Sequence, residues 1–411
     1  MRQGQLILKL RWASQCVHYI DMNMDTTAQI PGTGISLDQF PILQQCLYAN
    51  HAAISPWPRA ASQAVAAFAM ENSEIGADNY KHWFLREIQL RKRLAGLINA
   101  VSADDIALLK NTTEGICTVA NGIDWRKGDN LVLPAEEFPS NRLPWLALQR
   151  HGVEVREVDI RSTPEPENAL LERVDKRTRL LSVSAVQWTD GLRLKLETLG
   201  PFCRQNNVLF FVDAIQQLGA MQMDVQACCI DFLAADGHKW LLSPEGIAVF
   251  FCREALREQL RINQHGWHML DDPYQFNRDQ WQPSKTAMRF EAGSPNTLGQ
   301  VAMHASIGLL QEAGMPQVEA LIAANTRALS AGLADMRGVE LVRPFDPHRI
   351  SGIVSFSPAN RDLLEVQQVL KSRRLSCTVR GEAIRLSPHF YQAGKPVQEM
   401  LDIIESVINI I

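Results

Sequence analysis

The sequence lacks the cysteine patterns that mark a metal site or a disulfide scaffold. Its eight cysteines are scattered, with one adjacent pair at Cys228 and Cys229 but no C-x-x-C spacing. Reduced thiols in a cytoplasm are therefore the expected state. The formal charge of −4 leaves no basic surplus. We accordingly expect neither a metal ion nor a nucleic-acid partner.

Long apolar runs and a complete glycine fingerprint are also missing. No run approaches the roughly 20 apolar residues that a membrane-spanning helix needs. Residues 6–20 are partly apolar, but Lys9 and Arg11 interrupt them and no A-x-A cleavage site follows, so we expect neither a membrane anchor nor export. The turn at residues 31–34 carries two of the three glycines of a dinucleotide-binding motif and follows no strand, which argues against NAD.

The sequence does contain enough apolar residues for a large core. With 411 residues and a hydrophobic fraction of 46%, two or three globular domains are expected. Helical and strand-like segments alternate between residues 83 and 251, which predicts a mostly parallel sheet with helices on both faces. The pattern then changes to that of a smaller α+β domain. The predicted division is an extension (1–30), a segment packing with the small domain (31–60), a large domain (61–300) and a small domain (301–411).

One lysine lies in a part of the sequence where burying its positive charge would be unfavourable. Lys239 lies between the apolar runs 231–235 and 240–242, so we expect a neutral buried amine or an imine with an aldehyde. A lone lysine more often lies on a solvated turn. A second stretch favours the buried lysine over the solvated one. The apolar run 208–212 has the pattern of a strand buried on both faces, and Asp213 follows it directly.

These residues together fit pyridoxal 5′-phosphate (PLP). Ligands of parallel sheets gather at the carboxyl ends of the strands. There Asp213 would keep the pyridine nitrogen protonated, Gln216 would hydrogen-bond the ring's phenolic oxygen, and Lys239 would form the Schiff base.

Two further segments are candidates for contacts with the cofactor. A strand at residues 106–110 precedes a predicted helix that runs to about residue 121, with Thr112 or Thr113 as its N-cap, and such a helix start can bind a phosphate. Phe138 follows a predicted strand and could lie flat on the cofactor ring, although a core aromatic is the commoner role for a lone phenylalanine. Residues 144–151 are a predicted helix, and residues 74–84 a polar and aromatic loop that is a candidate for substrate access.

Four segments resemble one family. They are Asn-Thr-Thr-Glu-Gly at 111–115, Asp-Ala-Ile-Gln at 213–216, Asp-Gly-His-Lys at 236–239 and Arg-Phe-Glu-Ala-Gly-Ser-Pro-Asn at 289–296. Their order and spacing resemble the class V aminotransferase family of fold-type I PLP enzymes, which includes cysteine desulfurases, selenocysteine lyases, isopenicillin N epimerase and kynureninase. The resemblance runs from about Asn50 to the C-terminus. It implies a mostly parallel seven-stranded sheet, a smaller α+β C-terminal domain and PLP as the cofactor.

The resemblance also assigns roles within the site. His238 looks like a phosphate ligand beside Lys239, and Gln187 aligns with a polar residue near the ring oxygen. Asp236 replaces a Ser or Thr of the family, so its carboxylate would repel the phosphate unless it turns away. Ser294 stands where relatives reach the phosphate of a neighbouring subunit, which implies a homodimer with shared sites. The cofactor-binding residues expected in all are Thr112, Thr113, Glu114, Phe138, Gln187, Asp213, Gln216, Asp236, His238, Lys239 and Ser294.

The C-terminal part bears on the substrate. Arg385 is the expected clamp for the substrate carboxylate, and Asn50 and His51 are further candidates for substrate contacts. Cysteine desulfurases carry a nucleophilic cysteine on a loop before this arginine. That loop is missing here, and Cys377 has the pattern of a core cysteine.

The function expected from these residues starts with the removal of the Cα proton of a small amino acid by Lys239, with Asp213 keeping the ring cationic. The expected enzyme is an aminotransferase. The alternatives are an epimerase and a C–S lyase, with persulfide-forming desulfuration disfavoured by the missing loop. A PLP fold that serves only as a binding module is a rival from another class, against which the intact Lys239, Asp213 and His238 argue. The motifs do not name the substrate.

Overall fold

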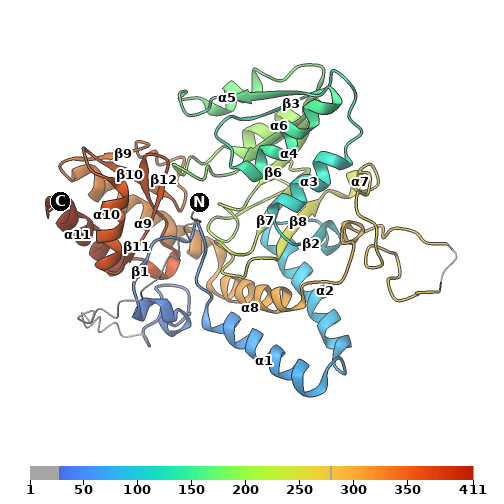
Figure 1. Cartoon of the computed structure of the whole chain (residues 1–411), viewed down its shortest axis with the longest axis horizontal. Helices are drawn as coiled ribbons and strands as arrows, with labels where there is room; N and C mark the ends of the chain where they lie inside the picture. The colour runs from blue at the N-terminus through green and yellow to red at the C-terminus, as the bar shows by residue number, and fades with distance from the viewer. Residues whose placement is uncertain (1–26, 278–279, 411) are drawn as a thin grey trace, which may run out of the picture.

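The structure is a computed structural model that describes residues 27–277 and 280–410. Most of the predicted N-terminal extension therefore lies outside the described residues. A seven-stranded sheet forms the centre of the larger part, in the order β2-β8-β7-β6-β5-β3-β4 (Figure 1). Its strands are β2 (Ile106–Leu109), β3 (Asn130–Pro134), β4 (Glu154–Val158), β5 (Thr178–Ser184), β6 (Leu209–Asp213), β7 (Phe232–Asp236) and β8 (Ala248–Cys252).

The sheet is parallel except at β8, which runs antiparallel to both β2 and β7. The neighbouring pairs β3–β4, β3–β5, β5–β6 and β6–β7 are all parallel. Parallel pairing needs crossover connections, and helices supply most of them here. The predicted mostly parallel seven-stranded sheet is confirmed.

Helices cover both faces of this sheet, as predicted. Alternate residues of a strand contribute to two separate apolar cores: Phe211 of β6 faces the core that includes Ile116, whereas Phe210 faces the core that includes Leu90 and Leu199. The helices of the larger part are α1 (Arg59–Ile75), α2 (Tyr80–Leu97), α3 (Thr112–Gly122), α4 (Leu143–Leu146), α5 (Pro166–Leu171), α6 (Leu196–Gln205), α7 (Glu254–Arg257) and α8 (Thr297–Ala313).

The C-terminal part has its own antiparallel sheet, in the order β12-β13-β10-β9. Its strands are β9 (Val339–Leu341), β10 (Val354–Pro358), β12 (Thr378–Arg380) and β13 (Ala383–Leu386), and its helices are α9 (Met315–Asp335), α10 (Leu363–Ser372) and α11 (Lys395–Ile410). A third apolar core lies between them. The α+β character of this part agrees with the prediction, while the domain boundaries stay a prediction.

A short strand from the start of the described chain joins this C-terminal part. β1 (Leu47–Tyr48) pairs in parallel with β11 (Leu375–Ser376), and Leu47 belongs to the third core (Figure 1). The chain thus enters beside its C-terminal part before it builds the large sheet.

Residues 74–84 are not the loop that the sequence predicted. α1 continues to Ile75 and α2 begins at Tyr80, so only a short turn separates two long helices. Aromatic packing across this turn stabilises the helices: the rings of Phe68 and Trp83 lie 4.9 Å apart, and Trp83 Nε1 donates to Glu71 Oε1 at 2.6 Å.

Two other local predictions need correction. The N-cap of α3 is Asn111, whose side chain accepts from the Glu114 backbone, while Thr112 is already helical. The predicted helix at 144–151 is four α-helical residues of α4 followed by a 3-10 turn at Ala147–His151. Among the helices of the described ranges, none combines the length and apolar character that crossing a bilayer requires.

Candidate active site

Two neighbouring strands of the large sheet each end in an aspartate at the same edge of the sheet. Asp213 is the last residue of β6 and Asp236 the last residue of β7, and the two strands run in parallel. Lys239 follows three residues after β7. The carboxyl ends of parallel strands therefore gather an acid, a second acid and a lysine at one place, as the sequence predicted.

Helix α3 begins beside this edge. Thr112 Oγ1 accepts a hydrogen bond from the Asp236 backbone at 2.9 Å, which ties the first turn of α3 to the end of β7. Gly115 allows this approach, because a Cβ at that position would lie only 2.8 Å from Ala234 Cβ. A larger residue would separate the helix from the strand.

Lys239 and Asp213 are electrostatically coupled. Burial lowers the pKa of the Lys239 amine to about 8, with the Asp213 carboxylate acting against this shift and the Arg385 guanidinium adding to it. Burial raises the pKa of Asp213, which is 2% exposed, to about 6, while the backbone N–H of Ile215 and the charge of Lys239 oppose the rise. The lysine is thereby prepared to lose its proton near neutral pH.

Phe138 faces the amine. Lys239 Nζ lies 5.7 Å from the centroid of the Phe138 ring, which is 42% exposed. Trp188 packs edge-on against the same ring, with the centroids 5.4 Å apart. An accessible aromatic surface therefore lies directly beside the lysine.

The two predicted amides differ in their availability. Gln216 has a partner on each polar atom, since its Oε1 accepts from Trp240 Nε1 at 3.0 Å and its Nε2 donates to the Ala52 carbonyl at 3.0 Å. The second N–H of Nε2 takes no part in these bonds, and the bond to a ring oxygen stays a prediction. Gln187 donates through Nε2 to Glu137 at 3.1 Å, and its buried Oε1 has no partner.

The residues expected at the phosphate surround the start of α3 and the end of β7. Thr113 Oγ1 donates to Ser140 Oγ at 2.8 Å, and the Glu114 carboxylate accepts from the Lys110 backbone at 2.7 Å. The Asp236 carboxylate lies 2.9 Å from His238 Nδ1. Asp236 thus faces the imidazole of His238, and its orientation relative to a phosphate stays a prediction.

Arg385 comes to this site from the small sheet. Its guanidinium is 1% exposed, and Nη1 donates to the Trp188 carbonyl at 2.5 Å, while Nε and Nη2 are buried without a partner. Burial and the nearby Arg380 lower its pKa to about 9. A buried guanidinium with two unused donors fits an anionic ligand.

The predicted residues that remain are His51, Asn50 and Ser294. His51 is fully buried, with Nδ1 2.8 Å from the Ser387 carbonyl and Nε2 2.6 Å from the Tyr391 hydroxyl, so no ring nitrogen is left for a substrate and its predicted role is not supported. Asn50 keeps a buried Oδ1 without a partner. Ser294 is exposed.

Sequence reasoning missed Glu137. This carboxyl group is 5% exposed and accepts from the Ser184 backbone at 2.6 Å, from the Ser184 hydroxyl and from Gln187. Burial raises its pKa to about 7, and the charge of Asp213 adds to the rise. Its position beside Phe138 in the chain was the only available signal.

Comparison with known proteins assigns the family. The model of the aminotransferase class V family matches residues 47–393, which is most of the chain. The chain belongs to the aminotransferase class V family.

Relatives of this class V chain cover nearly its whole length. A probable cysteine desulfurase from Methanothermobacter thermautotrophicus is 30% identical over 391 residues, covering 89% of this chain and 96% of the relative. Among solved structures, the cystine C–S lyase C-DES in complex with cysteine persulfide has a TM-score of 0.83 at 24% identity, covering 89% of this chain and 99% of that one. A cysteine desulfurase from Thermococcus onnurineus has a TM-score of 0.81 at 23% identity, with 90% and 96% covered. Both structures share the fold.

The relatives overturn the expected activity. Curated class V relatives of this chain carry the name cysteine desulfurase, and none of those named above is an aminotransferase. The prediction of an aminotransferase is therefore wrong, and the alternative of a C–S lyase agrees better with these names.

Class V enzymes depend on PLP, and the side chains of this site fit that cofactor. A buried Asp213, an accessible face of Phe138 and a lysine with a lowered pKa are the partners that its ring nitrogen, its ring face and its aldehyde require. The buried Oε1 of Gln187 has no hydrogen-bond partner within the protein, so it can accept a hydrogen bond from a ligand in the site.

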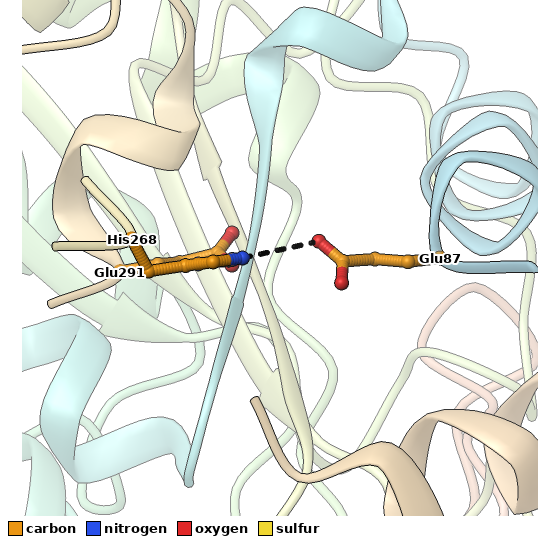
Figure 2. A group of neighbouring side chains, drawn as sticks. All are labelled: Glu87, His268 and Glu291. Atoms are coloured by element: carbon orange, nitrogen blue, oxygen red, sulfur yellow. Dashed lines mark ion pairs between the residues drawn. The ribbon is translucent and has the colours of Figure 1, made fainter. Parts of the chain in front are cut away.

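A second buried polar cluster joins Glu87, His268 and Glu291 in this class V chain (Figure 2). Their ligand atoms lie within 4.8 Å of one another. Arg91 supplies the positive charge, since Nη1 lies 2.5 Å from Glu291 and Nη2 lies 2.5 Å from Glu87. Glu291 also accepts from the Leu108 backbone at 2.8 Å. The cluster thus anchors the Arg-Phe-Glu-Ala-Gly-Ser-Pro segment to α2 and β2.

Proposed function

We propose that this protein is a PLP-dependent C–S lyase that breaks the Cβ–S bond of cysteine or an S-substituted cysteine by β-elimination. The names of its curated relatives support cleavage of a sulfur amino acid. The observation that carries the choice of elimination is the hairpin before Arg385. Only Gly381 and Glu382 separate β12 from β13, so this hairpin offers no cysteine to receive a sulfur atom.

Cys377 does not replace the missing nucleophile. Its side chain is 7% exposed and lies in the third apolar core. Burial raises the pKa of its thiol to about 12, whereas attack on sulfur requires a thiolate. A reaction in which the sulfur leaves directly needs no such group.

The residues of the site have separate proposed roles in binding the cofactor, moving the proton and binding the substrate. The cofactor supplies an electron sink for the charge that develops at Cα. We assign Lys239 to hold the cofactor and then to move the Cα proton, because its amine is partly neutral near pH 8. Asp213 holds the proton of the ring nitrogen, Phe138 stacks on the ring, and Arg385 binds the substrate carboxylate through its unused donors.

The other end of the cofactor lies at α3. We assign Thr113, His238 and the backbone N–H groups at the start of α3 to the phosphate, since a helix N-terminus favours an anion. Ser294 is exposed, which fits a contact with the phosphate of a second copy of the chain in a homodimer. The seven cysteines of the described residues are free thiols, which fits a reducing cytoplasm.

The product distinguishes the proposed reaction from its rivals. Purified protein with PLP is incubated with L-cysteine, L-cystine or β-chloro-L-alanine, and the three-carbon product is identified. Elimination yields pyruvate and ammonia, whereas desulfuration through an enzyme persulfide yields alanine. We expect pyruvate, and alanine as the main product would refute the proposal.

Two variants complete this test. Lys239→Ala removes the amine that moves the Cα proton and should lower pyruvate formation by at least a factor of about 1,000. Cys377→Ser should keep elimination within about a factor of three, because the thiol is buried and protonated. Loss of activity in Cys377→Ser, with an unchanged melting temperature, would identify this thiol as a participant.

A further inference from the structure

The carboxyl ends of four neighbouring strands bring a further buried acid, Glu137, to the proposed cofactor site. In the sheet order β7-β6-β5-β3, Lys239 follows β7, Asp213 ends β6 and Glu137 follows β3. Ser184, the last residue of β5, lies opposite Asp213 in the parallel ladder. It donates to Glu137 from both its backbone N–H and its hydroxyl. Ser184 therefore joins the two acids, because it pairs with one and binds the other.

The surroundings of Glu137 and Asp213 favour one negative charge on the pair over two. Glu137 is 5% exposed and Asp213 is 2% exposed. Burial raises the pKa of Glu137 to about 7, the hydrogen bonds from Ser184 oppose this rise, and the charge of Asp213 adds to it. Within residues 27–277 and 280–410, no cationic side chain forms an ion pair with Glu137. An ionised Asp213, which a protonated ring nitrogen requires, therefore favours a proton on Glu137.

Glu137 also orients the amide of Gln187. Gln187 Nε2 donates to Glu137 Oε1 at 3.1 Å, while Gln187 Oε1 is buried without a partner. An ionised carboxylate has only acceptors, so it binds the amide through its N–H₂ group. The amide oxygen is then the atom left for a ligand.

This orientation does not suit the ring oxygen beside which Gln187 is predicted to lie. A phenolic oxygen on a ring with a protonated nitrogen is acidic, so at neutral pH it is ionised and only accepts hydrogen bonds. Two acceptors that face each other repel, and a buried acceptor without a donor is unfavourable. Half a turn of the amide would bring Nε2 to the ring oxygen. It would also bring the amide oxygen to Glu137, where only a protonated carboxyl group offers a donor.

We propose that Glu137 takes up a proton when PLP binds, and that this proton turns the Gln187 amide so that Nε2 faces the ring oxygen of the cofactor. The proton comes from solvent and stays on Glu137 Oε1, which donates it to Gln187 Oε1, while Glu137 Oε2 still accepts from the Ser184 hydroxyl. Both polar atoms of the amide then have a partner. Glu137 is thus a positioning residue that acts through Gln187. The inference rests on the predicted place of Gln187 beside the ring oxygen and is independent of the bond that breaks in the substrate.

The number of protons taken up on cofactor binding tests this coupling. PLP is titrated into the apoprotein by calorimetry in two buffers of different ionisation enthalpy, and wild type is compared with Glu137→Gln, whose side chain stays neutral. Protons exchanged by PLP and Lys239 are common to both proteins and cancel in the difference. Because the pKa of Glu137 is about 7, wild type should take up about 0.5 more protons per site at about pH 7 and about 0.9 more at about pH 8. Equal uptake by the two proteins at the higher pH would overturn the proposal.

The difference in uptake also has a defined pH dependence. It should vanish at about pH 5, because Glu137 is then protonated before the cofactor binds. Above about pH 7, the free protein must first protonate this carboxylate, so the PLP affinity of wild type should fall relative to that of Glu137→Gln by up to about tenfold per pH unit. A ratio of the two affinities that stays constant with pH would assign Glu137 a structural role only.

Two further variants separate the amide from other effects. Gln187→Met removes the group that the proton turns, so Glu137→Gln should cause no further change in proton uptake in that background. Additional uptake that survives in Gln187→Met would show that Glu137 responds to the cofactor directly, which refutes the coupling through the amide. Glu136→Gln is the matched control. That half-buried carboxyl group has a pKa raised by burial and accepts from the Ile160 backbone at 3.4 Å, so its loss should leave the wild-type uptake unchanged.

Infrared spectroscopy of the unchanged chain gives a test that needs no variant to fold. At about pH 8, the difference spectrum between the PLP-loaded and the free protein should gain the carbonyl band of a protonated carboxyl group. Labelling with ¹³C-glutamate should shift this band, which distinguishes Glu137 from Asp213. Absence of a label-sensitive band would overturn the proposal. None of these measurements reads pyruvate formation, so failure of the proton coupling and failure of the lyase reaction are separate results.

Discussion

At the scale of single residues, Lys239 is where burial and charge act together. Burial favours the neutral amine, the charges of Arg385 and Arg380 favour it further, and Asp213 opposes them. The net result is a pKa of about 8, well below the value of a free lysine. An amine that must react with an aldehyde thereby has a much larger neutral fraction near pH 7 than a free lysine has.

The pH dependence of cofactor uptake tests this shift. The rate constant for PLP binding to the apoprotein should rise about tenfold per pH unit below pH 8 and level off above it, because the neutral amine is then fully formed. Stopped-flow absorbance of the bound cofactor measures this rate. Nα-acetyl-lysine serves as the control and should continue to rise to about pH 10; the same behaviour in the protein would contradict the shift.

The sequence predicted some residues of this site and not others, for a physical reason. Lys239 and Asp213 were predictable because each ends or follows an apolar run that only a buried strand explains. The hydrogen bonds of Gln216 and His51 were not predictable, because their partners, Trp240 and Tyr391, lie in other parts of the chain. Local sequence contains no record of such long-range hydrogen bonds.

At the scale of elements, the contact between α3 and β7 positions the proposed phosphate site. Gly115→Ala would place a Cβ 2.8 Å from Ala234 Cβ and 3.2 Å from a ring carbon of Phe250, so α3 must move away. We expect the free energy of unfolding to fall by about 1–3 kcal/mol and the affinity for PLP to weaken. Urea denaturation and cofactor titration measure the two effects.

A second helical glycine is the matched control. Gly96 of α2 is exposed, and a Cβ there would meet nothing within 4 Å. Gly96→Ala should therefore raise the free energy of unfolding by about 0.5–1 kcal/mol and leave PLP affinity unchanged. If the free energy of unfolding changed in the same direction in both variants, the close approach at Gly115 would not govern the packing of α3 against β7.

The elements themselves were predicted best where their pattern is long or strictly apolar. The strands of the large sheet and the helices α9 and α11 follow directly from such patterns. Residues 74–84 were misjudged because their aromatic side chains bind the preceding helix, with Trp83 against Phe68, and a mixed polar and aromatic segment alone does not reveal that partner.

At the scale of the whole molecule, the proposed shared site makes a prediction about mixed dimers. If Ser294 serves the partner's cofactor, Lys239→Ala and Ser294→Leu homodimers should each be impaired. A heterodimer of the two would hold one intact site and regain roughly half of the wild-type activity. Differently tagged chains, co-expressed and purified through both tags, allow pyruvate formation by the heterodimer to be measured. Absence of recovery would place Ser294 in its own subunit's site.

The pairing of β1 with β11 links residues 47–48 to residues 375–376 across most of the chain. A ribosome must therefore synthesise more than 300 further residues before the first of these strands finds its neighbour. Arg385 also follows all seven strands of the large sheet in the chain. A nascent chain that stops after β8 would carry Lys239 without Arg385, so it would lack the group proposed to hold the substrate carboxylate.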